Sequence, residues 1–439
     1  MHDADSGSIQ APPVWRNHCQ CTNTPLSSVE ALLQWTGTGP PLCCVWIPSE
    51  PKHRHRQLVA LHDMMGGYVE EDICVDGITI QDRPPYVLPL LSLVDTLVYF
   101  SHHVVTPPPR NWIHATQRCR TSILGTLIFE WEAGSRELCH LLAQSEECAR
   151  QLVAMAVHMG FHGWLVNIEC SLAGPKEVED VISFVDLLRT LLHEVIPGGQ
   201  VLWYDSVIHS GHLSWQNELN DKNGRFFEVC DGIMLNYFWR GQAHLERSTK
   251  VAADLERPPF DVLAGVDVHG RGTFGGGGRQ TWVGVEAARL AGCSAAVFAP
   301  GWALENADPP SSYWERNIDL WWGCPQENGI LQAHCGPPTY SSSKPLFEWI
   351  GGDSPIPRAA GDTLFRSNWC VGAGHSFWLR GQCVFQCPQK EQWWSILGVA
   401  EPQPPVPRET ADYRWVHDFD LAFDGGCSLR IESLKNSEE

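Results

Sequence analysis

The sequence predicts an α/β protein built as a (β/α)8 TIM barrel, with a partial β-sandwich region at its C-terminal end. Between residues 57 and 302 one pattern occurs eight times: a β-branched or aromatic run, a polar or glycine-rich break, and then helix-like periodicity. Near-continuous apolar runs are typical of strands buried on both faces. Eight such units in about 250 residues fit the size of this barrel. A doubly wound open sheet shares the periodicity and remains the alternative.

The eight predicted strands share an apolar centre and a polar or aromatic end. They span residues 57–63, 93–103, 121–131, 163–169, 200–207, 230–239, 261–270 and 294–302. Between the fourth and fifth, apolar residues recur every three or four positions from Val178 to Val195, which predicts an amphipathic helix. Pro197 and the two glycines after it end this helix. Residues 147–159 and 283–290 have the same helical character.

The chain is expected to have three parts. Residues 1–54 form an N-terminal extension with one short helix, capped by Ser27 or Ser28. Residues 55–325 form the barrel. Residues 326–439 form an incomplete β-rich accessory region, with a Pro-rich linker near 401–409. Because few residues follow that linker, we expect the accessory sandwich to be truncated.

Composition excludes several classes of protein. The chain has 439 residues, of which 43% are hydrophobic and 19% charged, so it is neither disordered nor an extended coiled coil. A net charge of −20 disfavours nucleic acid and anionic membranes. The polar N-terminus resembles no secretory signal and no apolar run is long enough for membrane insertion, which favours the cytosol. The 17 scattered cysteines are interpreted mainly as free, buried thiols.

Polar and aromatic residues fall late in the predicted strands. In a barrel of this kind the carboxyl ends of the strands carry the chemistry, so these side chains are expected to meet at one mouth. The candidates are Glu130, Trp131, Asn167, Glu169, Tyr204, Asn236, Tyr237, Trp239, Asp267 and Trp302. The aromatic members suit stacking on sugar rings, although one or two are expected to pack in the core instead.

Asn167 and Glu169 form the sharpest motif. Residues two apart on a strand project to the same face, so both side chains point together into the mouth. Apolar surroundings raise the pKa of a carboxyl group toward the range of a general acid, as cleavage of a glycosidic bond requires. Asn167 cannot act as a second carboxylate, but its amide can hydrogen-bond a 2-acetamido group that attacks its own anomeric carbon.

Other interpretations of these residues stay open. Both residues can have a purely structural role, with Glu169 in a salt bridge at the strand end and Asn167 capping the next turn. The Asn-x-Glu pattern alone is common. Glu130 and Glu169 can form a conventional pair of catalytic carboxylates on neighbouring strands. The glycine-rich stretch at 270–279 lacks the Lys-Ser/Thr ending of a phosphate loop and is expected to be a flexible loop. His102, His103 and residues 53–56 are interpreted as solvated surface and not as metal ligands.

Motifs along the whole barrel resemble glycoside hydrolase family 85. They are LHDMMGGYVE at 61–70, VYFSHH at 98–103, GTLIFEW at 125–131, FHGWLVNIE at 161–169, PGGQVLWYDSVIHSGHLSWQNELN at 197–220, DGIMLNYFW at 231–239, GVDVHGRG at 265–272 and FAPGW at 298–302. The resemblance implies a (β/α)8 barrel with accessory β-sandwich domains. It also implies hydrolysis of the GlcNAc-β1,4-GlcNAc bond of N-linked glycans, glycopeptides or free oligosaccharides, without a metal or organic cofactor.

The resemblance further implies residue roles. Asn167 positions the acetamido group, and Glu169 acts as acid and then as base through an oxazoline intermediate with retention of configuration. Tyr204, in the WYDS stretch, contacts the reacting acetamide region. Residues that line the glycan cleft are Glu130, Trp131, Trp215, Asn236, Tyr237, Trp239, Asp267 and Trp302.

The sequence departs from the family pattern at three places. Cys170 follows the catalytic motif where the family usually has Asn, and Phe129 precedes Glu130 in place of a small polar residue. Residues 87–94 replace an aromatic segment of the family. Together with the expected truncation of the accessory region, these departures leave an alternative to the endoglycosidase: a glycan-binding relative that has lost turnover.

Overall fold

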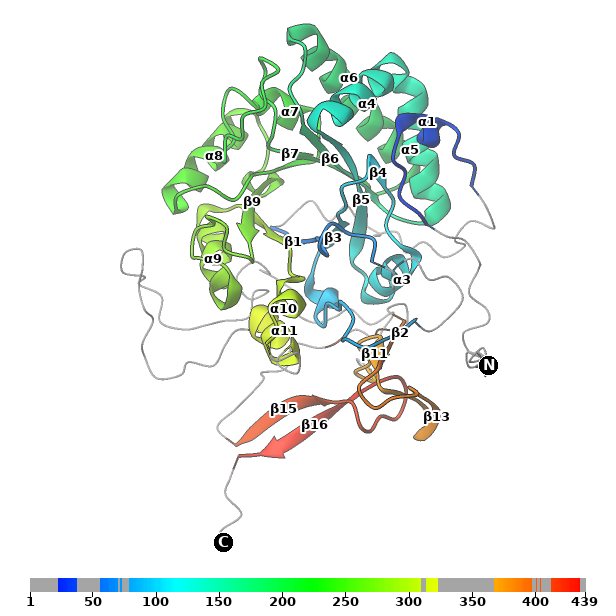
Figure 1. The fold of residues 1–439 in the computed structure, drawn as a ribbon. Helices are drawn as coiled ribbons and strands as arrows, with labels where there is room; N and C mark the ends of the chain where they lie inside the picture. Colours follow the sequence, from blue (N-terminus) through cyan, green and yellow to red (C-terminus); the bar gives the residue numbers. More distant parts are fainter. Residues whose placement is uncertain are drawn as a thin grey trace.

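The computed structural model describes residues 23–37, 56–69, 72, 79–308, 313–322, 367–396, 400, 403 and 412–434. Eight parallel strands in these ranges form a barrel surrounded by helices (Figure 1). Each predicted strand run contains one of them, so the predicted barrel is confirmed. The strands are β1 (Leu58–His62), β3 (Thr96–Tyr99), β5 (Ser122–Glu130), β6 (Gly163–Glu169), β7 (Gln200–Tyr204), β8 (Gly232–Met234), β9 (Val262–Asp267) and β10 (Ser294–Phe298).

The barrel is closed. Strand β1 pairs in parallel with both β10 and β3, and β3 in turn pairs with β5. Around the remaining circumference each strand pairs with its sequence neighbour. A short strand, β4 (Val105–Thr106), pairs antiparallel with β5 near the mouth. Because the sheet closes on itself, the open-sheet alternative is wrong.

Two apolar clusters separate the inside of the barrel from its outer layer. Leu124, Leu165 and Leu202 belong to the cluster inside the barrel. Trp164 and Ile168 belong to the outer cluster, which packs under the helices. Side chains alternate along a strand, so Asn167 and Glu169 continue the inward face of Leu165 toward the carboxyl end of β6.

Helices cover the outside of the barrel. They are α3 (Arg110–Cys119), α4 (Trp131–Ala143), α5 (Ser145–Met159), α6 (Pro175–Val195), α7 (Gly224–Glu228), α8 (Gln242–Asp254), α9 (Thr281–Ala291), α10 (Trp302–Glu305) and α11 (Tyr313–Trp322). The three helices predicted from periodicity are α5, α6 and α9. Helix α6 ends two residues before Pro197, as predicted. The short α1 (Val29–Leu33) begins after Ser28, whose hydroxyl accepts from the Ala31 N–H at 3.1 Å.

The C-terminal part of the described chain forms small antiparallel sheets, which lie below the barrel in Figure 1. One of them joins β11 (Ala373–Gly374) and β14 (Trp393–Ser395) to β2 (Thr79–Gln81), a strand from the connection between β1 and β3. The others are the pairs β12 (Ser376–Leu379) with β13 (Gln382–Gln386) and β15 (Tyr413–Asp418) with β16 (Ser428–Ser433).

The predicted part boundaries remain predictions. Most of the expected extension at 1–54, residues 326–366, and the predicted linker at 401–409 apart from Gln403 lie outside the described residues. In the described ranges no helix has both the length and the apolar character needed to cross a membrane. Ten described cysteines are free, and eight of them are buried.

Candidate functional site

The motif that ends β6 forms a hydrogen-bonded pair. Asn167 Nδ2 donates to Glu169 Oε1 at 3.1 Å, so the amide oxygen Oδ1 faces elsewhere. This oxygen is buried and has no hydrogen-bond partner in the described part of the chain. A buried acceptor without a partner is costly, and it is the kind of group that a ligand satisfies.

The environment of Glu169 favours its protonated form. Burial raises the pKa of this carboxyl group above its ordinary value, and the negative charge of Glu130 adds to the rise. The hydrogen bond from Asn167 and the charge of His102 oppose it. The predicted raised pKa therefore has burial as its main cause, as expected for a carboxyl group in a partly apolar site.

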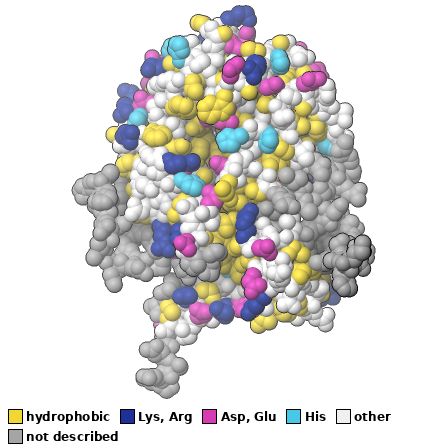
Figure 2. Space-filling model, viewed as in Figure 1, with side chains coloured by type: hydrophobic (Ala, Val, Ile, Leu, Met, Phe, Trp, Pro, Cys, Tyr) yellow, Lys and Arg dark blue, Asp and Glu magenta, His cyan; other side chains and the backbone are white. Residues whose placement is uncertain are grey.

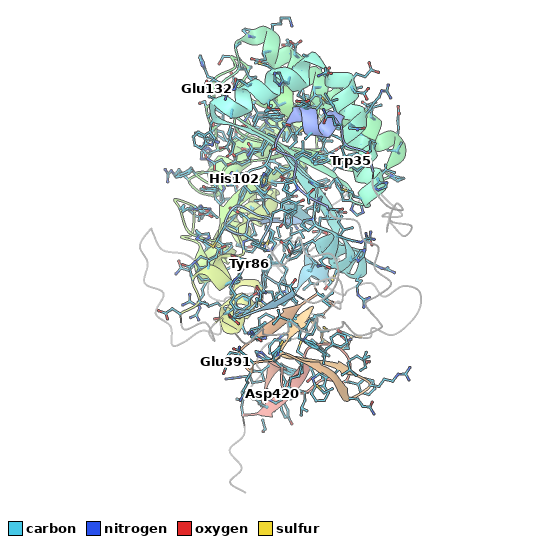
Figure 3. All side chains as sticks on the ribbon, turned by 45° about the vertical axis from the view of Figure 1, so that its right-hand side comes forward. Trp35, Tyr86, His102, Glu132, Glu391 and Asp420 are labelled. Atoms are coloured by element: carbon cyan, nitrogen blue, oxygen red, sulfur yellow. The ribbon has the colours of Figure 1, made fainter. Side chains whose placement is uncertain are left out.

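Glu130 lies directly beside Glu169. The two residues are register partners at the carboxyl ends of the parallel strands β5 and β6. Glu130 Oε2 is 2.8 Å from Nδ1 of His102, which lies in the loop after β3. That hydrogen bond raises the pKa of His102, which favours the imidazolium and with it an ion pair with Glu130. Figure 3 shows His102 between Glu132, near the start of α4, and Tyr86.

Tyr204 and Asn236 come together across strands β7 and β8. The Tyr204 hydroxyl donates to Asn236 Oδ1 at 3.2 Å, and the same oxygen accepts the Tyr237 N–H at 2.9 Å. The Phe298 ring packs against both tyrosines, with ring centroids 6.1 Å from Tyr204 and 5.6 Å from Tyr237. Burial raises the pKa of Tyr204 well above its usual range, so its phenol remains a hydrogen-bond donor.

Asp267 is completely buried and accepts hydrogen bonds from Arg271. It accepts bonds from Arg271 Nε at 3.0 Å and Nη2 at 2.9 Å, and from the Arg271 backbone N–H at 2.8 Å. The Arg271 guanidinium also lies over the Tyr237 ring, 6.0 Å from its centroid. Arg271 therefore reaches the mouth, whereas the buried Asp267 carboxylate, predicted to line it, holds this guanidinium from below.

The tryptophans predicted at the mouth divide into two groups. Trp131 is 78% exposed and Trp215 is 42% exposed, and Trp302 is half-buried. Trp239 is fully buried: its indole N–H donates to the Gly265 carbonyl at 2.7 Å. Trp239 therefore belongs to the outer core, as one or two aromatic residues were expected to do, and it does not lie on the exposed surface of the cleft. Its ring packs against Phe274, with centroids 5.3 Å apart.

The surface over the barrel suits a ligand with apolar and polar faces. Figure 2 shows a band of hydrophobic side chains along the middle of this face, with acidic, basic and histidine side chains beside it. The exposed Trp131 stands at the start of α4, directly after Glu130, with a positive φ of 61°. Exposure of the apolar ring to water and a positive φ at a residue other than glycine both cost free energy. Such costs are typical of functional positions.

The loop that carries Trp215 is anchored by a buried acid. Asp205 accepts from the Asn217 N–H at 2.6 Å and from Asn223 Nδ2 at 2.9 Å. Burial raises the pKa of Asp205 to about 6, against the hydrogen bonds that lower it. These contacts fix both ends of the Trp215 loop, and a sequence pattern alone does not reveal them.

The family departures face away from the barrel interior. Phe129 and Cys170 each follow or precede an inward-facing glutamate, so both side chains point outward and pack in the outer cluster. Burial raises the pKa of the Cys170 thiol to about 11, which keeps it neutral. In the segment 87–94, Val87 and Leu90 are buried in the same cluster. None of these side chains lies on the face that carries Glu169.

Two contributors to the site were assigned no role in it from the sequence. His102 falls late in its predicted strand run but was interpreted as solvated surface, and Arg271 was placed in a flexible loop. A His two or three residues past a strand end and an Arg four residues after a strand-end Asp are the signals that were present.

In the described ranges no group of three or more His, Cys, Asp and Glu side chains is arranged to hold a metal ion.

The fold and this cluster together define a (β/α)8-barrel protein with acidic, amide and aromatic side chains gathered at the carboxyl ends of its strands. The sequence profile described as Glycosyl hydrolase family 85 matches residues 68–377. The chain belongs to this family, as its motifs predict.

Curated relatives agree with this assignment. The chain is 35% identical over 417 residues to the cytosolic endo-beta-N-acetylglucosaminidase of Gallus gallus, covering 93% of this chain and 52% of that protein. It is 41% identical over 311 residues to the Homo sapiens protein of that name, covering 68% and 40%. The cytosolic endo-beta-N-acetylglucosaminidase 1 of Arabidopsis thaliana is 39% identical over 282 residues, covering 63% and 40%. The chain thus spans about half or less of these relatives.

A solved structure shares the fold. The Spr0440 glycoside hydrolase domain, Endo-D from Streptococcus pneumoniae R6, superposes with a TM-score of 0.68 at 18% sequence identity. The superposition covers 94% of this chain and 66% of that one.

Proposed function

We propose that this protein is a cytosolic endo-β-N-acetylglucosaminidase that hydrolyses the GlcNAc-β1,4-GlcNAc bond in the core of N-linked glycans. Its substrates are glycopeptides, N-glycosylated proteins or free oligosaccharides, and one GlcNAc remains on the peptide or reducing end. The names of the curated relatives from animals and Arabidopsis support both the activity and the compartment.

One observation carries the proposal: the unpartnered Oδ1 of Asn167 beside the carboxyl group of Glu169. A 2-acetamido group offers an N–H donor and a carbonyl oxygen on opposite sides of a planar amide. If Asn167 Oδ1 accepts that N–H, the acetamide is held in a fixed orientation, with its carbonyl oxygen free to approach the anomeric carbon. A hydroxyl group at this sugar position supplies no such internal nucleophile.

Two proton transfers by Glu169 complete the reaction. In the first step Glu169 donates its proton to the departing glycosidic oxygen, the C1–O bond breaks, and the acetamide oxygen forms a bond to C1, giving an oxazolinium ion whose nitrogen keeps its proton beside Asn167. In the second step the Glu169 carboxylate accepts a proton from water while the water oxygen attacks C1, and the C1–O bond of the oxazolinium ring breaks to restore the acetamide. Two inversions at C1 give net retention, and a raised pKa suits a group that serves first as acid.

The neighbouring side chains suit recognition of the sugar. The neutral Tyr204 hydroxyl donates to Asn236, and the negative charge of Glu169 adds to the rise in the Tyr204 pKa, so the phenol lies near enough to contact the acetamide region. The exposed Trp131 and Trp215 rings offer apolar faces for stacking on sugar rings. We assign Glu130, Asn236, Tyr237 and Trp302 to contacts with sugar hydroxyl groups and ring faces.

The family departures are one basis of the lectin-like alternative. Phe129 and Cys170 both pack in the outer cluster, so neither adds bulk or charge beside Glu169. This arrangement favours a catalytic protein over a non-catalytic one.

The test is mass spectrometry of an N-glycopeptide incubated with wild type, Glu169→Gln and Glu130→Gln proteins, each checked for cooperative unfolding. We expect the wild type to release a glycan and leave a peptide with a single GlcNAc. Glu169→Gln is expected to lose about 10²-fold to 10⁴-fold in turnover, because it cannot donate or accept the proton. Glu130→Gln retains measurable turnover, and a thiazoline mimic of the oxazoline inhibits the wild type.

Two outcomes contradict the proposal. A folded wild-type protein that binds the glycopeptide without releasing product is a glycan-binding protein. Loss of all chemistry in Glu130→Gln together with no inhibition by the thiazoline indicates a glycosidase with two catalytic carboxylates.

A further inference from the structure

We propose that His102 is a positioning residue: its imidazolium holds the Glu130 carboxylate in place and neutralises the charge that Glu130 presents to Glu169. The inference rests on the proposed role of Glu169 as the proton donor. His102 acts through Glu130 and is not assigned a contact with the reacting atoms.

The position of His102 is built by its surroundings. Its Nδ1 lies 2.8 Å from Glu130 Oε2, and its ring packs edge-on against Phe100 with centroids 5.2 Å apart. The preceding Ser101 hydroxyl is buried and bonded to the Thr106 hydroxyl at 2.7 Å, which ties the loop to β4. An ideal Cβ on Gly66 would lie 3.6 Å from His102 Cδ2, so the loop after β1 approaches the ring from another side.

Glu130 transmits the effect to Glu169. The two glutamates are register partners on adjacent parallel strands, so their Cα atoms lie about 4.8 Å apart. The Glu130 side chain is only 12% exposed, whereas the His102 side chain is 56% exposed. Charges at a partly buried site interact more strongly than charges in water. An unpaired Glu130 anion would therefore act directly on its neighbour.

The groups that act on this cluster come from several elements. Those that influence His102 are Glu130, Asp63 and Glu169, and His102 in turn helps to lower the pKa of the adjacent His103. Those that influence Glu169 are Asn167, Glu130 and His102, while Tyr204 and Tyr237 are themselves affected by the Glu169 charge. Arg271, whose guanidinium lies over the Tyr237 ring, is already bonded to Asp267.

Removal of the His102 imidazolium should raise the pKa of Glu169. His102 lowers the pKa of Glu169 and Glu130 raises it, so loss of His102 leaves the raising influence uncompensated. Glu169 then keeps its proton to higher pH. Because the first step needs protonated Glu169, the alkaline limb of the kcat/KM profile moves to higher pH.

The experiment compares His102→Ala, His102→Asn and His103→Ala across the pH range with an N-glycopeptide substrate. His102→Ala removes both the donor and the charge, so we expect an upward shift of the alkaline limb by about one pH unit and a kcat about 10-fold lower. His102→Asn places a neutral N–H near the position of Nδ1. It should restore kcat but keep the shifted limb. The matched control is His103→Ala, because the His103 ring packs against Tyr68. This variant should change neither kcat nor the position of the alkaline limb.

Other measurements separate this inference from the proposed function. A folded His102→Ala with an unshifted limb overturns the inference, as does an equal shift in His103→Ala. In a Glu130→Gln background His102→Ala should shift the limb less than it does in the wild-type background, and an equal shift in both backgrounds contradicts action through Glu130. A wild-type protein without turnover overturns the proposed function. NMR titration of ¹³C-labelled glutamate in wild type and His102→Ala then tests the inference separately, and an unchanged Glu169 pKa in His102→Ala overturns it.

Discussion

The buried amide of Asn167 has one hydrogen-bond donor in use and one acceptor free for a ligand. Its nitrogen donates to Glu169, and its oxygen is left without a partner in the described structure. The donated bond lowers the pKa of Glu169, against the larger effect of burial. The amide thus moderates the acid on one side while offering an acceptor to the substrate on the other.

Substitution of Asn167 is expected to affect turnover and pH dependence together. In Asn167→Ala the acetamide loses its acceptor, so kcat should fall about 10²-fold, comparable to the loss of one donor that stabilises a transition state. Loss of the bond to Glu169 also raises the pKa of that carboxyl group, which moves the alkaline limb of the kcat/KM profile to higher pH. Steady-state kinetics across the pH range measures both effects.

A substitution by aspartate provides the control for Asn167. Asn167→Asp keeps an acceptor oxygen but adds a negative charge beside Glu169, so the alkaline limb should move further than in Asn167→Ala. A change in KM alone in Asn167→Ala, with kcat intact, contradicts the assigned role.

At this scale the sequence predicted which face carries the chemistry but not how the side chains pair. Alternation along β6 placed Asn167 and Glu169 together, because strand geometry fixes that direction. His102 and Trp239 lie just beyond strand ends. There the direction of a side chain depends on loop dihedral angles, and no residue pattern encodes them.

At the scale of elements, the loop after β9 is tied down by one ion pair. Asp267 ends the strand, and Arg271 closes back onto it with side-chain and backbone bonds. Four glycines at 275–278 follow, all with positive φ. In this loop an ideal Cβ on Gly277 would lie 2.5 Å from the Gly270 nitrogen, so the chain approaches itself too closely for a side chain.

Loss of this ion pair should destabilise the protein. Arg271→Ala leaves the Asp267 carboxylate buried without its two side-chain bonds, and we expect a loss of about 1–3 kcal/mol in the free energy of unfolding. Urea denaturation measures it. The double variant with Asp267→Asn should recover part of the loss, because it removes the buried charge.

A surface pair serves as the comparison. Arg136→Ala breaks a bond to Glu132 in which both side chains are well exposed, and it should change stability by less than about 1 kcal/mol. Equal losses in Arg136→Ala and Arg271→Ala would contradict the account of a buried charge.

Helices and strands were largely predictable from the sequence where apolar residues recur at regular spacing. All eight barrel strands and the long α6 follow from apolar periodicity. The three-residue β2 was not predicted, because it is too short for a pattern and its partner β14 lies about three hundred residues later. Pairing between such distant short strands depends on tertiary packing.

At the scale of the whole molecule, buried histidines connect stability with pH. His62 packs between Tyr86 and Trp112, both ring nitrogens lack a hydrogen-bond partner in the described structure, and burial lowers its pKa to about 3. Burial likewise lowers the pKa of His417, in the C-terminal sheets, to about 4. Both are neutral in the native protein at neutral pH.

The sign of the pH effect follows from these values. The unfolded chain binds protons at histidine near pH 6.5, whereas the native protein does so only near pH 3 to 4. The stability is therefore full above pH 6.5 and is lost as the pH falls through this window. His62 alone should account for about 2 kcal/mol between pH 7 and pH 5.

Removal of His62 tests this effect. His62→Leu should flatten the pH dependence of unfolding and stabilise the protein at pH 5, because it replaces an unsatisfied polar ring by an apolar group of similar size. Chemical denaturation at pH 7 and pH 5 measures both changes. His140→Gln, on an exposed turn of α4, should leave the slope unchanged, and an unaltered slope in His62→Leu would refute the assignment.

The pairing of β2 with β14 has a consequence for synthesis on the ribosome. Residues of β2 emerge within the first fifth of the chain, but Trp393–Ser395, which complete its sheet, emerge much later. At about 5–20 residues per second the β2 edge waits roughly 15–60 s for its partner. During translation the nascent barrel thus carries an exposed strand edge in its β1–β3 connection, a site for chaperone binding or for mispairing with a neighbouring nascent chain.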